Sequence, residues 1–321
     1  VCALGVVETF KKERIKPPCN IVIIAFISEE SARFGLSTIG SKTIVGDVDK
    51  KKWEQIVDQA GISIRQAMED YGISWESFHQ AKHIPFPIDK FIELHIEQGR
   101  QLERKNKDVG IVTGIATPTR LKITIKGEAN HTGTTLMHER RDAFVAAAPI
   151  VTYVDRLAKD FNKDIADPLV ATVSTVNLVP NAINVIPGKV SIGIDIRSVD
   201  ESLKGSFVKE LQSFIQEHAK KVKASISVET TIQENAVLLD EQINRKMISC
   251  CQQLGISYQK MISGAGHDAM NMAKRWPTSM VFIPSKNGIS HHPKEYTPLR
   301  YLQSGTELLT QYVLHDEEGE T

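Results

Sequence analysis

The sequence predicts an α/β domain with a mixed sheet, interrupted by a smaller α+β domain. Short apolar runs without alternation, typical of buried parallel strands, lie near the two ends of the chain, at 21–27 and 280–283. Between about 117 and 229, apolar and polar residues alternate instead, as in a sheet with one exposed face. A length of 321 residues is sufficient for two domains.

The first part of the larger domain is expected over residues 1–116 and the second over 230–321. Residues 1–10 have helical spacing without a capping residue before them, so we expect that an N-terminal segment is missing. Residues 21–27 are predicted as a central parallel strand, 50–71 contain helical patterning, and 91–96 form another strand.

The inserted domain is expected over residues 117–229 in the order strand, helix, strand, strand, helix, strand. The clearest segments are an alternating strand at 121–125, a helix at 139–161, a strand at 190–196, an amphipathic helix at 203–215 and a strand beginning at 226. This order predicts a half-exposed antiparallel sheet backed by two helices.

Composition bears on the expected partners and on the cellular compartment. Lys plus Arg and Asp plus Glu number 39 each, which gives no electrostatic reason to expect nucleic acid or an anionic membrane as partner. No run of 18 apolar residues is present, so we expect no membrane span. The four cysteines form no C-x-x-C pair, and we interpret them as reduced thiols of a cytoplasmic protein.

Two segments near the first and second predicted strands carry candidate chemistry. Glu29 and Glu30 directly follow the run 21–27, where one carboxylate could bind a metal and the other move protons, although a solvated acidic turn is the simpler interpretation. His95 shares a strand face with Glu93 and Glu97, so a carboxylate could orient its second ring nitrogen. A hydrogen-bonded structural histidine is the alternative.

Later loops carry further polar groups. His131 lies in a small polar loop that suits substrate binding or an ordinary turn. Arg197 on a strand could grip a carboxylate, or could form only a surface pair with Asp195. In the last part, His267 lies in a glycine-rich loop, and His291 lies in a loop where Glu295 could support a metal-binding histidine.

Taken together, the motifs are far more specific than any one alone. They include FISEE with RFG from Phe26, ELHIEQG from Glu93, GEANHTGTT from Gly127, NVIPG from Asn184, DIR from Asp195, SGAGHDA from Ser263 and GISHHPKE from Gly288. In this order and spacing the chain resembles, over essentially its whole length, the dinuclear-zinc amidohydrolases that include N-carbamoyl-L-amino-acid hydrolases, allantoate amidohydrolases and β-ureidopropionases.

The resemblance implies a zinc-peptidase-like catalytic domain, an inserted lid and dimerisation domain at 117–229, and a homodimer. Glu29 matches the general base. Glu30 and His291 match ligands of one metal, and His95 matches a ligand of the other. His131 matches a group that stabilises the oxyanion, often across the dimer. The matching substrate-binding positions are Gln98, His131, Asn184, Arg197, Gly266 and His267, with Arg197 holding the substrate carboxylate.

The resemblance also has gaps. The family usually has Pro where this chain has Arg100 and Leu136, and these are local loop changes. The family's His-x-Asp motif and its bridging Asp come before the helix that opens this chain. Two divalent metal ions, zinc by default and manganese as an alternative, would therefore have an incomplete ligand set, and we expect this chain alone to bind metal poorly and to be inactive.

The function that the resemblance implies is metal-dependent hydrolysis of a ureido or amide C–N bond in a small carboxylate-bearing substrate, foremost an N-carbamoyl-L-amino acid. Allantoate amidohydrolase and β-ureidopropionase are alternatives within the group. A related aminoacylase or dipeptidase is a wider alternative. A non-catalytic dimeric protein without a full metal site is an alternative of another kind.

Overall fold

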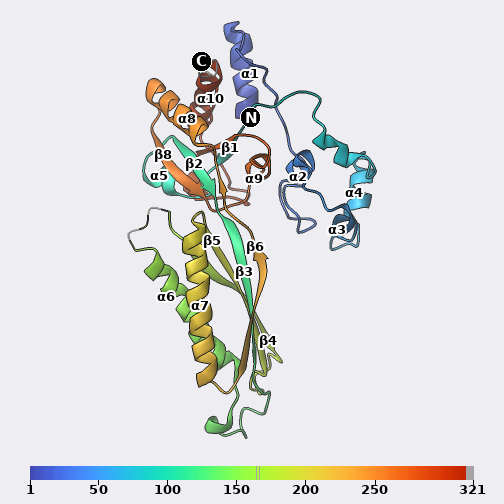
Figure 1. Ribbon diagram of the computed structural model, residues 1–321, viewed down its shortest axis with the longest axis vertical. Coiled ribbons are helices and arrows are strands. Elements are labelled where there is room, and N and C mark those ends of the chain that lie inside the picture. The colour runs from blue at the N-terminus through green and yellow to red at the C-terminus, as the bar shows by residue number, and fades with distance from the viewer. Residues whose placement is uncertain (164, 166, 316–321) are drawn as a thin grey trace. The chain divides into compact units, whose positions relative to one another are not determined.

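The computed structural model describes residues 1–163, 165 and 167–315, and the chain divides into two compact units. Unit 1 comprises Val1–Ile115 and Leu238–Thr321, and unit 2 comprises Ala116–Val237 (Figure 1). The predicted end of the inserted domain at residue 229 falls inside a strand. This strand continues to Gln233, because it remains paired that far. The predicted α/β class with a mixed sheet is confirmed.

The sheet of unit 1 contains parallel and antiparallel pairs. β1 (Phe91–Ile96) is parallel to β9 (Thr278–Ile283), β9 is antiparallel to β2 (Val109–Ile115), and β2 is parallel to β8 (Tyr258–Ser263). The two-residue β7 (Val237–Leu238) also belongs to this sheet. β9 is buried along its whole length, which confirms the apolar strand predicted at 280–283.

Helices and short turns complete unit 1. They are α1 (Cys2–Glu13), α2 (Ile39–Val45), α3 (Lys50–Glu54), α4 (Ile64–Asp70), η1 (Phe78–Lys82), α5 (Gln101–Arg104), α8 (Glu241–Leu254), α9 (Ala269–Met272), η3 (Lys286–Gly288) and α10 (Leu299–Leu314). α1 packs beside α10, as Figure 1 shows. The helical pattern predicted at 50–71 is split into α3 and α4, since Val57 and Ser63 form a short bridge between them.

The strand predicted at residues 21–27 is wrong. The described chain contains no ladder partner for this run, and Val22 and Ile23 are 51% and 40% exposed. An apolar run forms a strand only when neighbouring strands bond its backbone. Phe26 packs edge-on against the ring of Phe91 at the start of β1, with ring centroids 6.0 Å apart, but the two residues form no backbone ladder.

Unit 2 has the predicted order of elements. Its antiparallel sheet runs β4–β5–β3–β6, and two helices cover one face (Figure 1). The elements are β3 (Thr117–Lys126), η2 (Met137–Glu139), α6 (Ala143–Phe161), β4 (Val170–Val179), β5 (Lys189–Ser198), α7 (Glu201–Lys221) and β6 (Ser225–Gln233). The alternation in β3 is the cause: Leu121, Ile123 and Ile125 are buried against the helices, and the residues between them face outwards.

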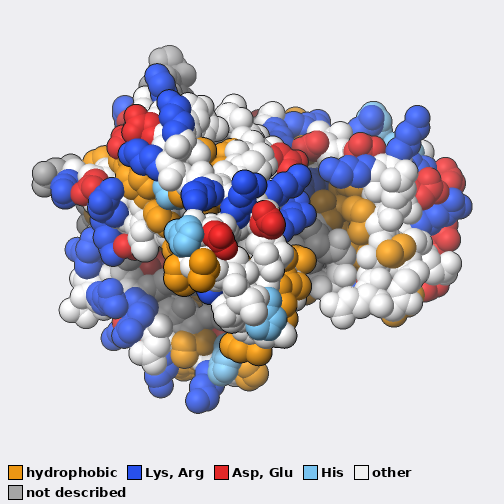
Figure 2. All heavy atoms as spheres, turned by 90° about the horizontal axis from the view of Figure 1, so that it is seen from below, with side chains coloured by type: hydrophobic (Ala, Val, Ile, Leu, Met, Phe, Trp, Pro, Cys, Tyr) orange, Lys and Arg blue, Asp and Glu red, His pale blue; other side chains and the backbone are white. Residues whose placement is uncertain are grey.

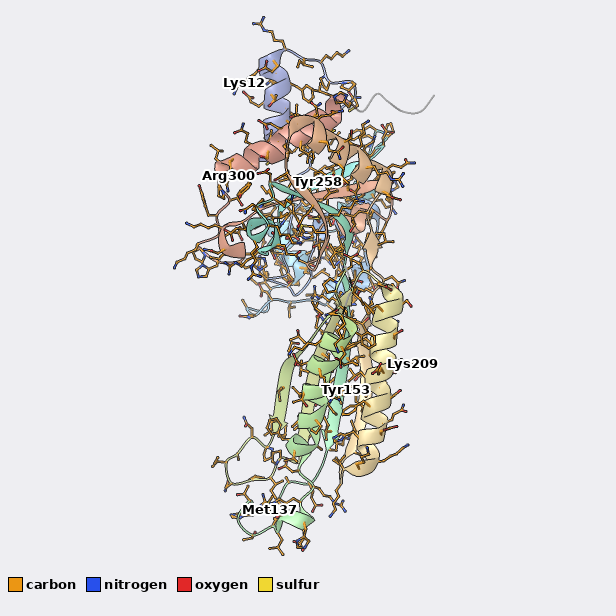
Figure 3. All side chains as sticks on the ribbon, turned by 90° about the vertical axis from the view of Figure 1, so that its left-hand side faces the viewer. Lys12, Met137, Tyr153, Lys209, Tyr258 and Arg300 are labelled. Carbon is orange, nitrogen blue, oxygen red and sulfur yellow. The ribbon has the colours of Figure 1, made fainter. Side chains whose placement is uncertain are left out.

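Side-chain caps and stacking fix the two helices of unit 2. α6 begins at Ala143, four residues later than predicted, because the Asp142 carboxylate accepts the backbone N–H groups of Phe144 and Val145. Tyr153 of α6, labelled in Figure 3, stacks on Phe214 of α7 with ring centroids 3.8 Å apart.

Charges of both signs are spread over the surface. On the face in Figure 2, Lys and Arg side chains lie among Asp and Glu side chains, in keeping with their equal numbers. Among the described residues, none of the helices combines the length and the apolar character that crossing a membrane requires.

Candidate active site

The backbone around Glu29 is held by the first turn of α2. The carbonyl groups of Ile27, Ser28 and Glu29 accept the N–H groups of Gly40, Ile39 and Thr38 at 2.8–3.1 Å. The first N–H groups of a helix have no partner within the helix, so this loop satisfies them. The paired carboxylates of Glu29 and Glu30 therefore start from a fixed backbone, although no strand precedes them.

Glu29 lies among other acidic groups. Burial raises the pKa of its carboxyl group, and the negative charges of Glu30 and Asp268 raise it further, while His291 lowers it. A carboxylate with a raised pKa is a stronger base than one in water. The charges of Glu30, Asp268 and His291 therefore all act on the Glu29 carboxyl group.

Glu30 and His291 lie in contact. Glu30 Oε1 is 2.9 Å from His291 Nε2, and both side chains are more than half exposed. His291 has a left-handed backbone with φ 55°, and its N–H donates to the Glu295 carboxylate at 3.1 Å. Glu295, predicted to support a metal-binding histidine, thus holds the backbone of the His291 loop rather than a histidine ring.

Gln98 joins the end of β1 to the same loop. Its Nε2 donates to the hydroxyl group of Ser290 at 3.1 Å, and its own backbone is left-handed with φ 56°. Gln98 is therefore placed beside His291 by contacts within unit 1.

His95 is oriented differently from the prediction. Its Nδ1 lies 2.9 Å from the carbonyl oxygen of Ile96, so a carbonyl and not a carboxylate orients the ring. Glu97 is buried instead beneath α5, where its carboxylate accepts the N–H groups of Gln101 and Leu102 at 2.7 and 2.9 Å. Glu97 therefore caps α5 and does not support His95.

His267 is a buried neighbour of His95, with ring centroids 4.7 Å apart. Its Nε2 bonds Ser263 Oγ at 3.0 Å, whereas its Nδ1 has no hydrogen-bond partner and lies 3.9 Å from Glu93 Oε1. Burial lowers the pKa of His267 to about 3 and raises the pKa of Glu93 to about 8. A Cβ at the preceding Gly266 would lie 3.3 Å from the Met270 sulfur.

Three further polar side chains of unit 1, which are not among the predicted site residues, form a buried hydrogen-bonded group. Ser41 of α2 donates to Asp268 Oδ1 at 2.5 Å and accepts from Asn271 Nδ2 at 2.9 Å, and all three side chains are buried. Asp268 stands beside His267 in the GAGHDA motif, which was the available signal. Nothing in the sequence pairs it with Ser41, because that contact joins distant segments.

In unit 2, the loops of His131 and Asn184 lie together. Thr132 N–H donates to the Asn184 carbonyl at 3.1 Å, and His131 pairs with Val185 in an isolated β-bridge. The ring Nδ1 of His131 accepts the N–H of Gly133 at 3.0 Å. These two predicted residues therefore share one end of the sheet, where Lys126 pairs with Lys189.

Arg197 lies at the opposite end of that sheet. It is eight residues beyond Lys189 along β5 (197 minus 189), which corresponds to about 26 Å of strand. Its Nε donates to Asp195 Oδ1 at 2.7 Å, so the predicted Asp–Arg pair is present. The structure therefore separates Arg197 from His131 and Asn184 within one copy of unit 2.

Unit 1 contains donor atoms of the kinds that a divalent metal binds. Zinc takes carboxylate oxygen and imidazole nitrogen, usually four ligands in all. Glu30 and His291 present one atom of each kind in direct contact, and the Nδ1 contact of His95 leaves its Nε2 as the candidate ligating nitrogen. In the part of the chain that the structure describes, no three His, Cys, Asp or Glu residues are grouped closely enough to hold an ion. These residues fit part of a coordination sphere.

The fold and these side chains define a class: a two-unit α/β protein whose larger unit gathers carboxylate and imidazole groups of the kind that metal-dependent hydrolases use. The chain belongs to Peptidase family M20/M25/M40, whose model matches residues 1–315. The predicted relationship is thereby confirmed, since the curated relatives include the predicted amidohydrolases.

Several relatives match almost the whole chain. An uncharacterized hydrolase of Haemophilus influenzae is 35% identical over 99% of this chain and 76% of its own length. Allantoate amidohydrolase of Bacillus subtilis is 33% identical over 97% of this chain and 74% of its own. N-carbamoyl-L-amino-acid amidohydrolase of Paenarthrobacter aurescens is 33% identical over 96% and 74%.

Solved structures of other proteins have a similar fold. A hydantoinase/carbamoylase family amidase from Burkholderia multivorans aligns with a TM-score of 0.84 and 28% identity, covering 98% of this chain and 74% of that one. The structure of AtUAH in complex with glyoxylate aligns with a TM-score of 0.76 and 33% identity, covering 98% and 75%.

Proposed function

We propose that the protein hydrolyses a C–N bond of a small, linear, carboxylate-bearing ureido or amide substrate, foremost an N-carbamoyl-L-amino acid. The products would be the L-amino acid, CO2 and ammonia. The names of the relatives and the family membership support this reaction class. The observation that carries the proposal is the 2.9 Å contact of His291 with Glu30, the residue next to Glu29 in the chain.

Three residues of unit 1 would contribute to a site for two divalent metal ions. Glu30 and His291 would share one ion, and His95 would ligate the other through Nε2. Zinc is the proposed metal and manganese the alternative. Such ions, when bound, polarise a carbonyl group and lower the pKa of water.

Glu29 is the proposed general base. It would accept a proton from the attacking water, whose oxygen forms the new bond to the ureido carbonyl carbon. As the C–N bond breaks, the same proton would pass to the leaving nitrogen. The raised pKa of Glu29 supports this role, because the carboxyl group must both take up and release a proton.

The substrate-binding roles fall on residues of both units. Gln98, Gly266 and His267 would line the site in unit 1. In unit 2, Arg197 would bind the substrate carboxylate, Asn184 would donate to the substrate, and His131 would stabilise the oxyanion.

The separation of His131 from Arg197 supports a homodimer. About 26 Å of strand separates the two ends of the sheet, so one small substrate cannot contact both residues of the same copy. If both act on one substrate, two copies must supply them. We therefore propose assembly through unit 2, the region predicted at 117–229.

Other substrates fit the same residues. Allantoate, β-ureidopropionate and ureidoglycolate also carry a ureido group and a carboxylate, and relatives named for allantoate and ureidoglycolate are 33% identical. An aminoacylase or dipeptidase activity is a wider alternative. A non-catalytic dimeric protein is the alternative of another kind.

We also propose a cytoplasmic protein with a small-molecule substrate rather than a nucleic acid or membrane partner. The buried cysteines Cys2, Cys250 and Cys251 suit a reducing compartment.

The test is to assay the complete natural protein, loaded with zinc or manganese, on N-carbamoyl amino acids, allantoate, ureidopropionate, ureidoglycolate and a dipeptide. We expect Glu29→Gln to reduce kcat by about 10²–10⁴-fold with the fold unchanged. The surface variant Glu13→Gln is the matched control. Turnover in Glu29→Gln close to that of the natural protein would remove Glu29 as the base, and no turnover of any substrate by the metal-loaded natural protein would favour the non-catalytic alternative.

A further inference from the structure

Arg197 belongs to a cluster of three charged residues on the open face of the unit 2 sheet. Asp195 accepts from Arg197 Nε at 2.7 Å through Oδ1 and from Arg120 Nε at 2.8 Å through Oδ2. One carboxylate thus bridges two guanidinium groups. We call Arg120, Asp195 and Arg197 the arginine bridge.

The arginine bridge is built entirely on paired strands. Arg120 of β3 and Asp195 of β5 are direct cross-strand partners. Asp195 and Arg197 are two residues apart on β5, so their side chains share a face. Asp195 and Arg197 are about one-fifth and one-quarter exposed, and Arg120 about 45%. No loop intervenes, so the sheet fixes the spacing of all three groups.

The Asp195 carboxylate contacts one edge of the Arg197 guanidinium group. Besides the Nε contact, Arg197 Nη2 lies 3.3 Å from Asp195 Oδ2, which fixes the plane of the guanidinium group. The contact with Asp195 involves two nitrogens of the guanidinium group. Orientation by a fixed carboxylate reduces the entropy lost when such a group binds an anion.

The charge balance explains the need for Arg120. An Arg197–Asp195 pair alone has no net charge and would attract a carboxylate weakly. With Arg120 included, the three groups carry a net charge of plus one. Burial raises the pKa of Asp195, but hydrogen bonds from Arg197 and Arg120 outweigh this and lower it, so Asp195 remains ionised at neutral pH.

We propose that Arg120 and Asp195 are positioning residues that give Arg197 its orientation and its net positive field for a substrate carboxylate. This rests on the proposed function, in which Arg197 contacts that carboxylate. In this proposal Arg120 acts through its contact with Asp195 rather than on the substrate.

The experiment uses the complete natural protein with its metal and two matched substrates: an N-carbamoyl amino acid and the corresponding N-carbamoyl amino acid amide, which lacks the charge. Arg120→Met is expected to raise KM for the acid roughly three- to tenfold, with kcat for either substrate within about twofold. KM for the amide is expected to stay unchanged. Asp195→Asn should also raise KM for the acid, although it adds positive charge, because Arg197 loses its orienting partner.

Two further variants sharpen the result. Lys122→Met removes a positive charge from the same exposed face of β3, two residues beyond Arg120, and is expected to leave both KM values unchanged. Arg120→Lys keeps the charge and should restore part of the lost affinity. An equal rise of KM in Lys122→Met and Arg120→Met, or unchanged KM in Arg120→Met, would overturn the inference.

Arg197→Met tests the carboxylate-binding role of Arg197 separately from the positioning role of Arg120 and Asp195. If Arg197→Met loses the preference for the acid over the amide but Arg120→Met and Asp195→Asn do not, only the positioning inference fails. If Arg197→Met retains that preference, the carboxylate-binding role in the proposed function fails instead. Circular dichroism and the thermal midpoint of each variant, compared with those of the natural protein, show whether the variant is folded.

Discussion

Glu30 Oε1 lies 2.9 Å from His291 Nε2, although these residues come from the two separate stretches of chain that build unit 1. The loop of Glu30 is anchored to α2, and the loop of His291 is anchored by Glu295 and by the Gln98–Ser290 contact. The contact therefore follows from two independently fixed loops.

The Glu30–His291 contact predicts a specific loss of metal. In the complete natural protein, His291→Ala should weaken zinc binding more than about tenfold, because a direct ligand is worth at least as much as a supporting residue. His292→Ala is the control, since its Nδ1 only accepts the N–H of Lys294. Zinc per chain after dialysis measures both, and equal losses in the two variants would contradict the assignment of His291.

Removal of the buried hydroxyl group of Ser41 should destabilise unit 1. Ser41→Ala leaves the Asp268 carboxylate and the Asn271 amide without their buried partner, which should cost about 1–3 kcal/mol in the free energy of unfolding. Ser304→Ala, at a surface hydroxyl on α10, should change it far less. Urea denaturation of both variants tests this, and a stability loss in Ser304→Ala equal to that in Ser41→Ala would count against it.

Lys204 should be important for the stability of unit 2. Its side chain is 3% exposed, and Nζ donates to Glu201 Oε1 and to the Glu234 carbonyl, both at 2.8 Å. Lys204→Met should therefore reduce the free energy of unfolding by about 1–3 kcal/mol. Lys209→Met, on the exposed part of the same helix in Figure 3, should be nearly neutral. Thermal melts that rank the two variants equally would refute the prediction.

The arginine bridge should stabilise unit 2 in a pH-dependent way. Since the pKa of Asp195 is lowered in the folded state, its contribution is present above the ordinary value of 3.8 and is lost as pH falls through the folded value. Arg120→Met should therefore destabilise the protein at pH 7, and the difference from the natural protein should shrink below pH 3.8. Urea midpoints measured across that range test the sign, and a difference that grows on acidification would be the wrong sign.

Substitution of two glycines of unit 2 by alanine should change the free energy of unfolding in opposite directions. A Cβ at Gly127 would lie 1.9 Å from the Arg141 carbonyl oxygen, so Gly127→Ala should cost at least about 1–3 kcal/mol. Gly205 lies inside α7 with no atom within 4 Å of a Cβ, and Gly205→Ala should gain up to about 1 kcal/mol. Urea titrations measure the change in the free energy of unfolding for both variants. An unchanged value in Gly127→Ala would show that the loop relaxes around the added methyl group.

The local pattern of the sequence was sufficient for unit 2. Leu121, Ile123 and Ile125 alternate with exposed residues, and this alternation directly gives a sheet with one face under two helices. The same pattern failed for residues 21–27, because an apolar run does not reveal whether other strands will pair with it. The motifs located the candidate residues, but not which carboxylate serves which histidine: Glu97 caps α5, and the Ile96 carbonyl orients His95.

By itself the sequence determined the fold class, the order of elements in unit 2 and the family, because these depend on periodicity and on motif order along the chain. Only the tertiary structure decided the contact of Glu30 with His291, the burial of Asp268 against Ser41 and the separation of His131 from Arg197. The reason is physical: such contacts join distant segments, and their geometry depends on how loops and strands pack, which no local pattern records.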